Sequence, residues 1–243
     1  MVKALQFHRI VNRLQFCGTW NTPEQLDSFI NTIYRSGYDI VLPGDDRDGL
    51  IITFDDGEEN LYYFVLPILR KYRCPAIIFL IVDYIGKKNL WDISFFNKRN
   101  RHLNWQQILE MRESGVVFGS HTMTHRNLSR LSKQALEYEI YESKRILEKY
   151  LGTVDTISYP FNRINKTVLQ VVKKAGYKYG FGGDGFNNLT IKKEAIYITD
   201  NPLTLNIKIS ETPPLLYRYE RLQQKVINYF TIATMLKRFN ING

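Results

Sequence analysis

The sequence predicts an α/β protein in which parallel strands alternate with helices. Two observations support this. Strand-like and helix-like segments alternate from end to end of the 243 residues, as in repeated β-α units. Several strand candidates are also continuous apolar runs, of which 77–82 is the clearest, and such runs suit strands that are covered on both faces. The length fits one large α/β domain or at most two small ones.

The strand candidates are short and regularly spaced. In chain order they are 4–8, 39–42, 50–54, 76–82, 116–119, 154–159, 178–182 and 195–198. Two of them, 50–54 and 116–119, run directly into polar, chemistry-bearing residues. Because parallel β-α units place the ends of such strands on one face of the fold, we expect those residues to meet.

Helix start and stop signals lie between the strands. Thr22 is an N-cap candidate followed by Pro23 and a capping-box glutamine, Gln25. Asn104 can cap a second helix that ends by Gly115, and 165–176 is a further capped segment. Pro67 falls inside a helical pattern, which predicts a kink or a late start there. The longest helix should follow Ser132 and stop at Gly152, with one apolar face made of Leu136, Ile140, Leu147 and Leu151.

The composition narrows the functional classes. The net charge is +9, but the basic residues are spread along the chain and no nucleic-acid motif accompanies them, so no nucleic acid is expected as a partner. Cys17 and Cys74 have no metal-site spacing and form no disulfide framework. No signal peptide and no transmembrane segment is seen, so a cytoplasmic location is expected for the sequence as given, or an extracytoplasmic one if a leader has been removed.

The composition changes after Thr212. Pro213 and Pro214 break the chain, and 215–239 has the pattern of a basic, aromatic helix. We therefore expect a main domain over 1–212 and a C-terminal helical extension over 213–243. This helix either docks on the domain or offers a peripheral contact surface for a membrane or a partner protein.

The Thr-Phe-Asp-Asp-Gly stretch at 53–57 places two adjacent carboxylates at the end of an apolar run. Like charges side by side require a proton or a cation between them. A second polar group, His121 to His125, follows the strand candidate 116–119. One carboxylate and two imidazoles form a common catalytic metal shell that leaves a position open for water. A His-x-x-x-His pair or an Asp-Asp-Gly turn alone is usually structural, but both directly after apolar strands indicate a site.

These two motifs resemble those of the polysaccharide deacetylase family, the carbohydrate esterase family 4 with a NodB-homology domain. The first motif is matched at 53–57 and the second by His121-Thr122-Met123-Thr124-His125. The similarity extends over about 5–200 and is nearest to the poly-N-acetylglucosamine deacetylase-like branch. The resemblance implies a distorted (β/α) barrel and a bound Zn²⁺, or another divalent ion such as Co²⁺ or Ni²⁺. It also implies Asp55 as the general base and Asp56, His121 and His125 as the metal ligands.

The third family motif is altered here. Where the family has an Arg followed by a Pro-Tyr-Gly type of turn, this chain has Ser158, Tyr159, Pro160, Phe161 and Asn162. The resemblance assigns 159–161 to substrate and oxyanion binding, the oxyanion donor being the backbone N–H of Phe161. Of the aromatic side chains that could stack on a sugar, only Tyr159 lies in a motif. The Arg that normally orients the catalytic base is missing.

The family's C-terminal general-acid histidine is also absent, since no histidine follows His125. The branch resembling poly-N-acetylglucosamine deacetylases carries an equivalent histidine near the N-terminus, where this chain has His8. We therefore expect His8 to protonate the leaving amine. His102 is expected at the surface or on the substrate side.

The sequence thus predicts a metal-dependent deacetylase that releases acetate from an N-acetylated glycan. Three alternatives stay open: an O-acetyl esterase, a carbohydrate-binding protein on a catalytically degenerate scaffold, and a glycosidase. The last is disfavoured because two adjacent carboxylates do not flank a scissile bond.

Overall fold

The computed structural model describes residues 3–12, 19–88 and 101–210, and its centre is a seven-stranded parallel sheet. The strand order is β8-β7-β6-β5-β4-β1-β9, and a parallel bridge between Phe181 and Ile191 joins the two edges. The predicted (β/α) barrel is therefore confirmed, as a sheet that nearly closes on itself. The strands of this sheet are β1 Lys3–Phe7, β4 Leu50–Phe54, β5 Ile77–Leu80, β6 Val117–Ser120, β7 Thr156–Ser158, β8 Tyr179–Phe181 and β9 Lys193–Ala195.

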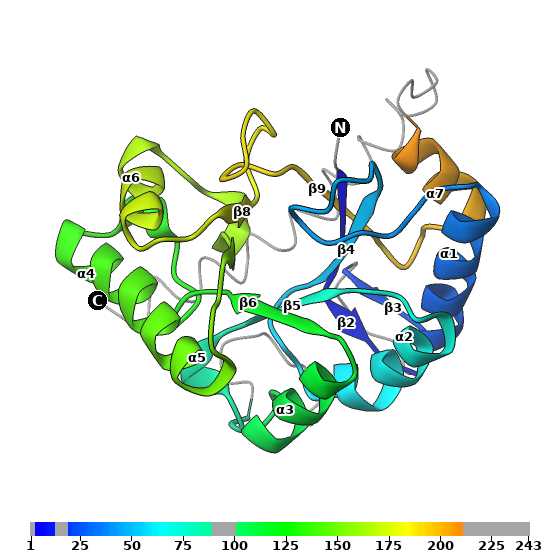
Figure 1. The fold of residues 1–243 in the computed structure, drawn as a ribbon, viewed down its shortest axis with the longest axis horizontal. Helices are drawn as coiled ribbons and strands as arrows, with labels where there is room; N and C mark the ends of the chain where they lie inside the picture. The colour runs from blue at the N-terminus through cyan, green and yellow to red at the C-terminus, as the bar shows by residue number, and fades with distance from the viewer. Residues whose placement is uncertain (1–2, 13–18, 89–100, 211–243) are drawn as a thin grey trace.

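The helices lie outside the strands, and Figure 1 shows them as an arc around the sheet, with α7 beside α1. A separate two-stranded parallel sheet, β2 Arg9–Ile10 with β3 Trp20–Asn21, follows β1. The helices are α1 Pro23–Arg35, α2 Leu66–Tyr72, α3 Trp105–Glu113, α4 Lys133–Glu137, α5 Ser143–Leu151, α6 Lys166–Lys174 and α7 Pro202–Ile209. Shorter turns are the π-helical η1 Leu61–Val65 and η4 Tyr138–Glu142, and the 3₁₀ turns η2 Val82–Tyr84, η3 Leu128–Arg130 and η5 Pro160–Asn162.

The capping signals in the sequence are confirmed. Thr22 and Gln25 form a complete capping box at the start of α1, and Asn104 with Gln107 does the same for α3. Ser132 caps α4 and Asn165 caps α6. The expected long helix after Ser132 runs to Leu151, but as α4, η4 and α5 with a π turn in the middle.

Pro67 has the predicted effect. The helix after the acidic pair begins as the π turn η1, and Pro67, which has no N–H to donate, is the second residue of α2, directly after the change from π to α geometry. Four apolar residues of the long helix, Leu136, Ile140, Leu147 and Leu151, are all buried as expected.

Two strand predictions need correction. Segment 39–42 forms only an isolated bridge from Ile40 to Leu50, because Pro43 ends the run and β4 is already paired with β1 and β5. The last strand is 193–195 rather than 195–198, since the chain turns after Ile196, where the Tyr197 N–H donates to the side chain of Asp200 at 2.7 Å.

Alternate residues of each strand pack into two separate hydrophobic cores, because successive side chains of a strand point to opposite faces. Leu5, Ile52 and Ile78 belong to the large cluster between the sheet and the helices. Their neighbours Ala4, Ile51 and Ile77 belong to a small second cluster, which also contains Val41, Phe79 and Phe181. We identify this second cluster as the barrel interior. It lies beneath the strand ends that carry the polar motifs.

Some sequence-based expectations lie outside the described residues. These are the boundary at 212, the C-terminal extension over 213–243, and the states of Cys17 and Trp91. Cys74 is buried, as expected for a packed thiol. Over 3–12, 19–88 and 101–210, the helices are all too short or too polar to cross a membrane.

Candidate active site

The end of β4 delivers the two adjacent carboxylates in different directions. Asp55 continues the strand, with its backbone N–H donating to the Phe7 carbonyl at 3.0 Å, and it is 1 % exposed. Asp56 has a φ of 72°, and this left-handed conformation turns the chain sharply after Asp55. Gly57 continues the turn at a φ of 64°, and a Cβ there would lie 2.6 Å from the side chain of Leu80. The Asp-Asp-Gly sequence thus separates the two carboxyl groups.

The His121-x-x-x-His125 segment is an irregular loop after β6, not a helical turn. Thr122 and His125 both have left-handed φ angles, 69° and 60°. The loop is held by its own short side chains, because the Ser120 hydroxyl accepts from Thr122 N–H and the Thr122 hydroxyl accepts from His125 N–H, each at 3.1 Å. The two imidazoles nevertheless converge, with ring centroids 4.7 Å apart.

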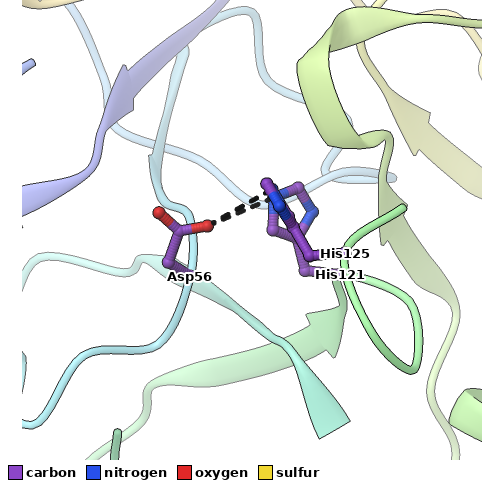
Figure 2. A group of neighbouring side chains, drawn as sticks. All are labelled: Asp56, His121 and His125. Atoms are coloured by element: carbon purple, nitrogen blue, oxygen red, sulfur yellow. Dashed lines mark ion pairs between the residues drawn. The ribbon is translucent and has the colours of Figure 1, made fainter. Parts of the chain in front are cut away.

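Asp56, His121 and His125 come together as predicted. Their candidate ligand atoms all lie within 4.8 Å of one another. Oδ1 of Asp56 lies 3.5 Å from Nε2 of His121 and 3.6 Å from Nε2 of His125. Figure 2 shows the carboxylate and the two rings facing one another across this short gap.

The donor set fits a divalent transition ion. Two ligand atoms bound tetrahedrally to Zn²⁺ at 2.0–2.1 Å lie about 3.4 Å apart, close to the separations seen here. Nδ1 of His121 lies 2.8 Å from the Ser158 carbonyl, and a hydrogen bond from this nitrogen leaves Nε2 as the lone-pair donor. Burial lowers the pKa of the His121 imidazole to about 4, against the opposing effect of Asp55, so the ring is neutral at physiological pH.

Asp55 is surrounded by donors. Its Oδ2 accepts from the Lys193 ammonium at 2.7 Å and from the Gln6 amide at 2.6 Å. The Ser158 hydroxyl lies 3.2 Å from both carboxylate oxygens. Burial alone would raise the pKa of the Asp55 carboxyl, but the positive charge of Lys193, joined at low pH by the protonated imidazoles of His121 and His8, outweighs it. The pKa is held well below its usual range, and the group is ionised.

His8 lies in the same group of side chains. Its Nε2 is 3.2 Å from the Gln6 amide nitrogen, which also donates to Asp55. Since an amide nitrogen can only donate, Nε2 of His8 accepts and the ring is neutral. Burial lowers the pKa of His8, while Asp55 acts in the opposite direction. The structure therefore places His8 beside the predicted base.

The third motif contacts both histidines of the trio, but not as predicted for Tyr159. The Phe161 ring packs against His125 with centroids 4.8 Å apart, and Phe161 adopts a φ of 59°. Pro160 is buried beneath this turn. The Tyr159 side chain is fully buried and its hydroxyl donates to the Leu189 carbonyl at 2.8 Å. Its ring is therefore part of the core and not a platform for a sugar.

Several site residues were missed from the sequence. Gln6 could have been found, because it lies on β1 two residues before His8, which directly follows this strand, and alternate residues of an extended chain point to the same side. Lys193 could not, because its partner Asp55 is 138 residues away. His102, expected at the surface or on the substrate side, is only 2 % exposed, and its Nδ1 lies 2.9 Å from the Asp56 carbonyl. It thus contacts the backbone of the Asp56 turn.

Comparisons with known proteins identify a family and similar folds. The sequence profile of the family described as polysaccharide deacetylase matches residues 44–180. The poly-beta-1,6-N-acetyl-D-glucosamine N-deacetylase of Staphylococcus aureus (strain MRSA252) is 36 % identical over 140 residues, which cover 54 % of this chain and 46 % of that protein. The chain thus spans about half the length of the curated relatives it matches.

Solved structures share the fold. The deacetylase PplD of Streptococcus pyogenes, in complex with acetate, superposes with a TM-score of 0.76 at 22 % identity, covering 86 % of this chain and 98 % of that one. BC0361, a polysaccharide deacetylase from Bacillus cereus, gives a TM-score of 0.73 at 23 % identity, covering 86 % and 69 %. The family profile covers more than half of the sequence, including both motifs, and the chain therefore belongs to the polysaccharide deacetylase family.

Proposed function

We propose that this chain is a metal-dependent hydrolase that removes acetyl groups from the N-acetylated sugars of a polysaccharide or oligosaccharide. The observation that carries the proposal is the trio Asp56, His121 and His125, with ligand atoms within 4.8 Å, next to a buried and ionised Asp55. Family membership and an N-deacetylase among the relatives support the acetamide as the bond that is cleaved.

Asp56, His121 and His125 would hold the cation. A carboxylate and two imidazoles suit Zn²⁺, and Co²⁺ or Ni²⁺ accept the same ligands. When bound, such an ion supplies Lewis acidity, which polarises the acetyl carbonyl and makes an attacking water more acidic.

The remaining steps belong to side chains and backbone of this chain. Asp55 accepts a proton from the water as the oxygen of this water bonds to the acetyl carbon. The backbone N–H of Phe161 is the proposed donor to the oxyanion that forms. His8, which is neutral in the resting site, takes up the proton that Asp55 has accepted and donates a proton to the sugar nitrogen as the carbon–nitrogen bond breaks. Acetate and a free amine leave. The lowered pKa of His8 makes its protonated ring a stronger acid for this step.

Acetate release tests the proposal. Zinc-loaded protein is expected to release acetate from acetylated chito-oligosaccharide, and chelation should abolish the activity. Asp55→Asn should lower kcat by about 10²–10⁴-fold, the usual contribution of a general base, while Zn²⁺ still binds. The carboxamide of asparagine is nearly isosteric with the carboxylate it replaces. The control is that Asp55→Asn folds like the wild type.

The outcomes separate the alternatives. Acetate released from a generic acetyl ester but not from the acetamide would identify an esterase. Zn²⁺ and glycan bound with no acetate from either substrate would contradict the enzymatic proposal and leave a carbohydrate-binding protein. Activity that remains after chelation would contradict the proposed metal dependence.

A further inference from the structure

Lys193 is a buried charge that the proposed reaction does not yet use. It begins β9, the strand that lies on the far side of β1 from β4, and pairs there in register with Ala4. Its side chain is 1 % exposed, and its ammonium lies 2.7 Å from Oδ2 of Asp55 and 2.7 Å from the Ser158 hydroxyl. Burying two charges costs several kcal/mol each before pairing, so such a pair is weak evidence for a purely stabilising role.

The donors act unequally on the two oxygens of Asp55. Oδ2 accepts from Lys193 and Gln6 at 2.7 and 2.6 Å, whereas the contact described for Oδ1 is the longer one, 3.2 Å from the Ser158 hydroxyl. The Ser158 hydroxyl accepts from Lys193 and donates toward the carboxylate. Lys193 and Ser158 therefore fix the plane of the carboxyl group from two different strands, β9 and β7.

The ammonium of Lys193 supplies a positive charge beside Asp55 that the residues around Ser158 do not provide. Ser158 is too short and uncharged to hold a carboxylate by itself, but the ammonium of Lys193 reaches both Ser158 and Asp55 from 35 residues further along the chain. The family profile ends at residue 180, so it contains neither Lys193 nor β9.

We propose that Lys193 is a positioning residue for the deacetylation, and that its ammonium, together with Ser158, anchors the Asp55 carboxylate in the orientation in which it accepts a proton from the attacking water. The inference rests on the proposed function, with Asp55 as base. The contacts described for the Lys193 ammonium are with Asp55 and Ser158, and not with a metal-ligand candidate. Its effect is on orientation, and a carboxylate displaced by about 1 Å can cost roughly 100-fold in rate.

The chain contains a matched control. Lys208 of α7 is also a fully buried lysine paired with an aspartate, Asp200, and its ammonium also donates to the Ala195 carbonyl at 3.0 Å. Both lysines hold the same C-terminal part of the domain, but none of the contacts described for Lys208 is with a site residue. If Lys193 only fastens β9, the two lysines should behave alike.

The experiment compares Lys193→Met with Lys208→Met in the whole chain loaded with Zn²⁺, using acetylated chito-oligosaccharide. Lys193→Met is expected to lower kcat by roughly 100-fold with KM and Zn²⁺ affinity unchanged. Lys208→Met is expected to lower the thermal midpoint but leave kcat unchanged. Equal kcat for Lys193→Met and wild type would overturn the inference, as would equal losses in both variants.

A second variant covers a failure of Lys193→Met to fold. Ser158→Ala removes only a hydroxyl, and the same inference predicts a fall in kcat of about tenfold, the equivalent of one hydrogen bond, with KM unchanged. Wild-type kcat in Ser158→Ala would contradict the anchoring. An inactive wild-type protein that binds Zn²⁺ would instead contradict the proposed function itself, so the two failures are distinguishable.

Discussion

At the scale of single residues, the backbone conformation determines which partners each of the two adjacent carboxylates contacts. Asp55 and Asp56 are neighbours in sequence, yet the left-handed φ of Asp56 turns its carboxylate toward His121 and His125. Asp55 remains at the strand end, against Lys193. Two adjacent negative charges are tolerated because each has its own partners. The proposed function uses this separation, with one carboxylate binding a cation and the other serving as base.

The buried imidazoles predict how stability depends on pH. His121 has a folded pKa of about 4, whereas an unfolded histidine titrates near 6.5. Between these values the unfolded chain binds a proton that the folded chain does not, so the free energy of unfolding falls as the pH falls. One such group contributes at most about 1.4 kcal/mol per pH unit. His8, whose pKa is also lowered, acts in the same direction.

Urea denaturation of the chelated, metal-free protein between about pH 7 and about pH 5 measures this slope. His121→Gln should reduce the slope, because glutamine does not titrate. Asp55 contributes nothing in this window, since its lowered pKa adds stability that is lost only below the unfolded value of about 3.9. A slope that is unchanged by His121→Gln would contradict the assignment.

At the scale of elements, the π turn η4 supports the histidine loop. It brings Glu139 inward, where the side chain is 2 % exposed. Its carboxylate accepts from the Thr124 N–H at 2.9 Å and from the Thr124 hydroxyl, and its carbonyl accepts from the Met123 N–H at 3.2 Å. A π turn adds a residue to the helix and so changes which side chain faces the core. Glu139 therefore fixes the loop between the two metal-ligand candidates.

Glu139→Gln is expected to weaken Zn²⁺ binding by about 10–100-fold, the usual effect of disturbing groups that orient metal ligands. Glu142 belongs to the same π turn, but its carboxylate pairs with Arg145 on the outside of the helix at 2.8 Å. Glu142→Gln is thus the matched control, with unchanged affinity. A chelator-competition titration measures both variants, and equal affinities would show that Glu139 does not position the ligands.

At the scale of the whole molecule, side chains packed in the narrow barrel interior lie beneath the site. Phe79 and Phe181 fill it, with ring centroids 5.1 Å apart. Gly119 on β6 faces the same space, where a Cβ would lie 2.6 Å from the Phe79 ring and would also meet the Thr156 hydroxyl. Glycine is needed here for space, not for its backbone angles.

Gly119→Ala is therefore expected to destabilise the fold by about 1–3 kcal/mol, the usual cost of overpacking. Phe79→Leu in the same chain should restore part of the loss by making room for the added methyl group. Chemical denaturation of the single and double variants measures both effects. A fully stable Gly119→Ala would mean that the barrel can expand at this level.

Most of the architecture, and the meeting of Asp56 with His121 and His125, could be predicted from local sequence. The caps at Thr22 and Asn104, the apolar strands and the two motifs are each contained within a few residues. The start of β9 at Lys193, which was not predicted, shows where local sequence signals fail. A charged residue at the head of a strand resembles a loop unless its distant partner is known.

The sequence by itself determined the family, the barrel fold and the residues that converge at the strand ends, because strand and cap signals are local and parallel strands end on one face. Only the tertiary structure decided what surrounds them. It buried Tyr159 against Leu189, placed His102 behind Asp56, and brought Lys193 to Asp55. Such contacts depend on closing a sheet across 138 residues, and no local pattern records the ion pair that results.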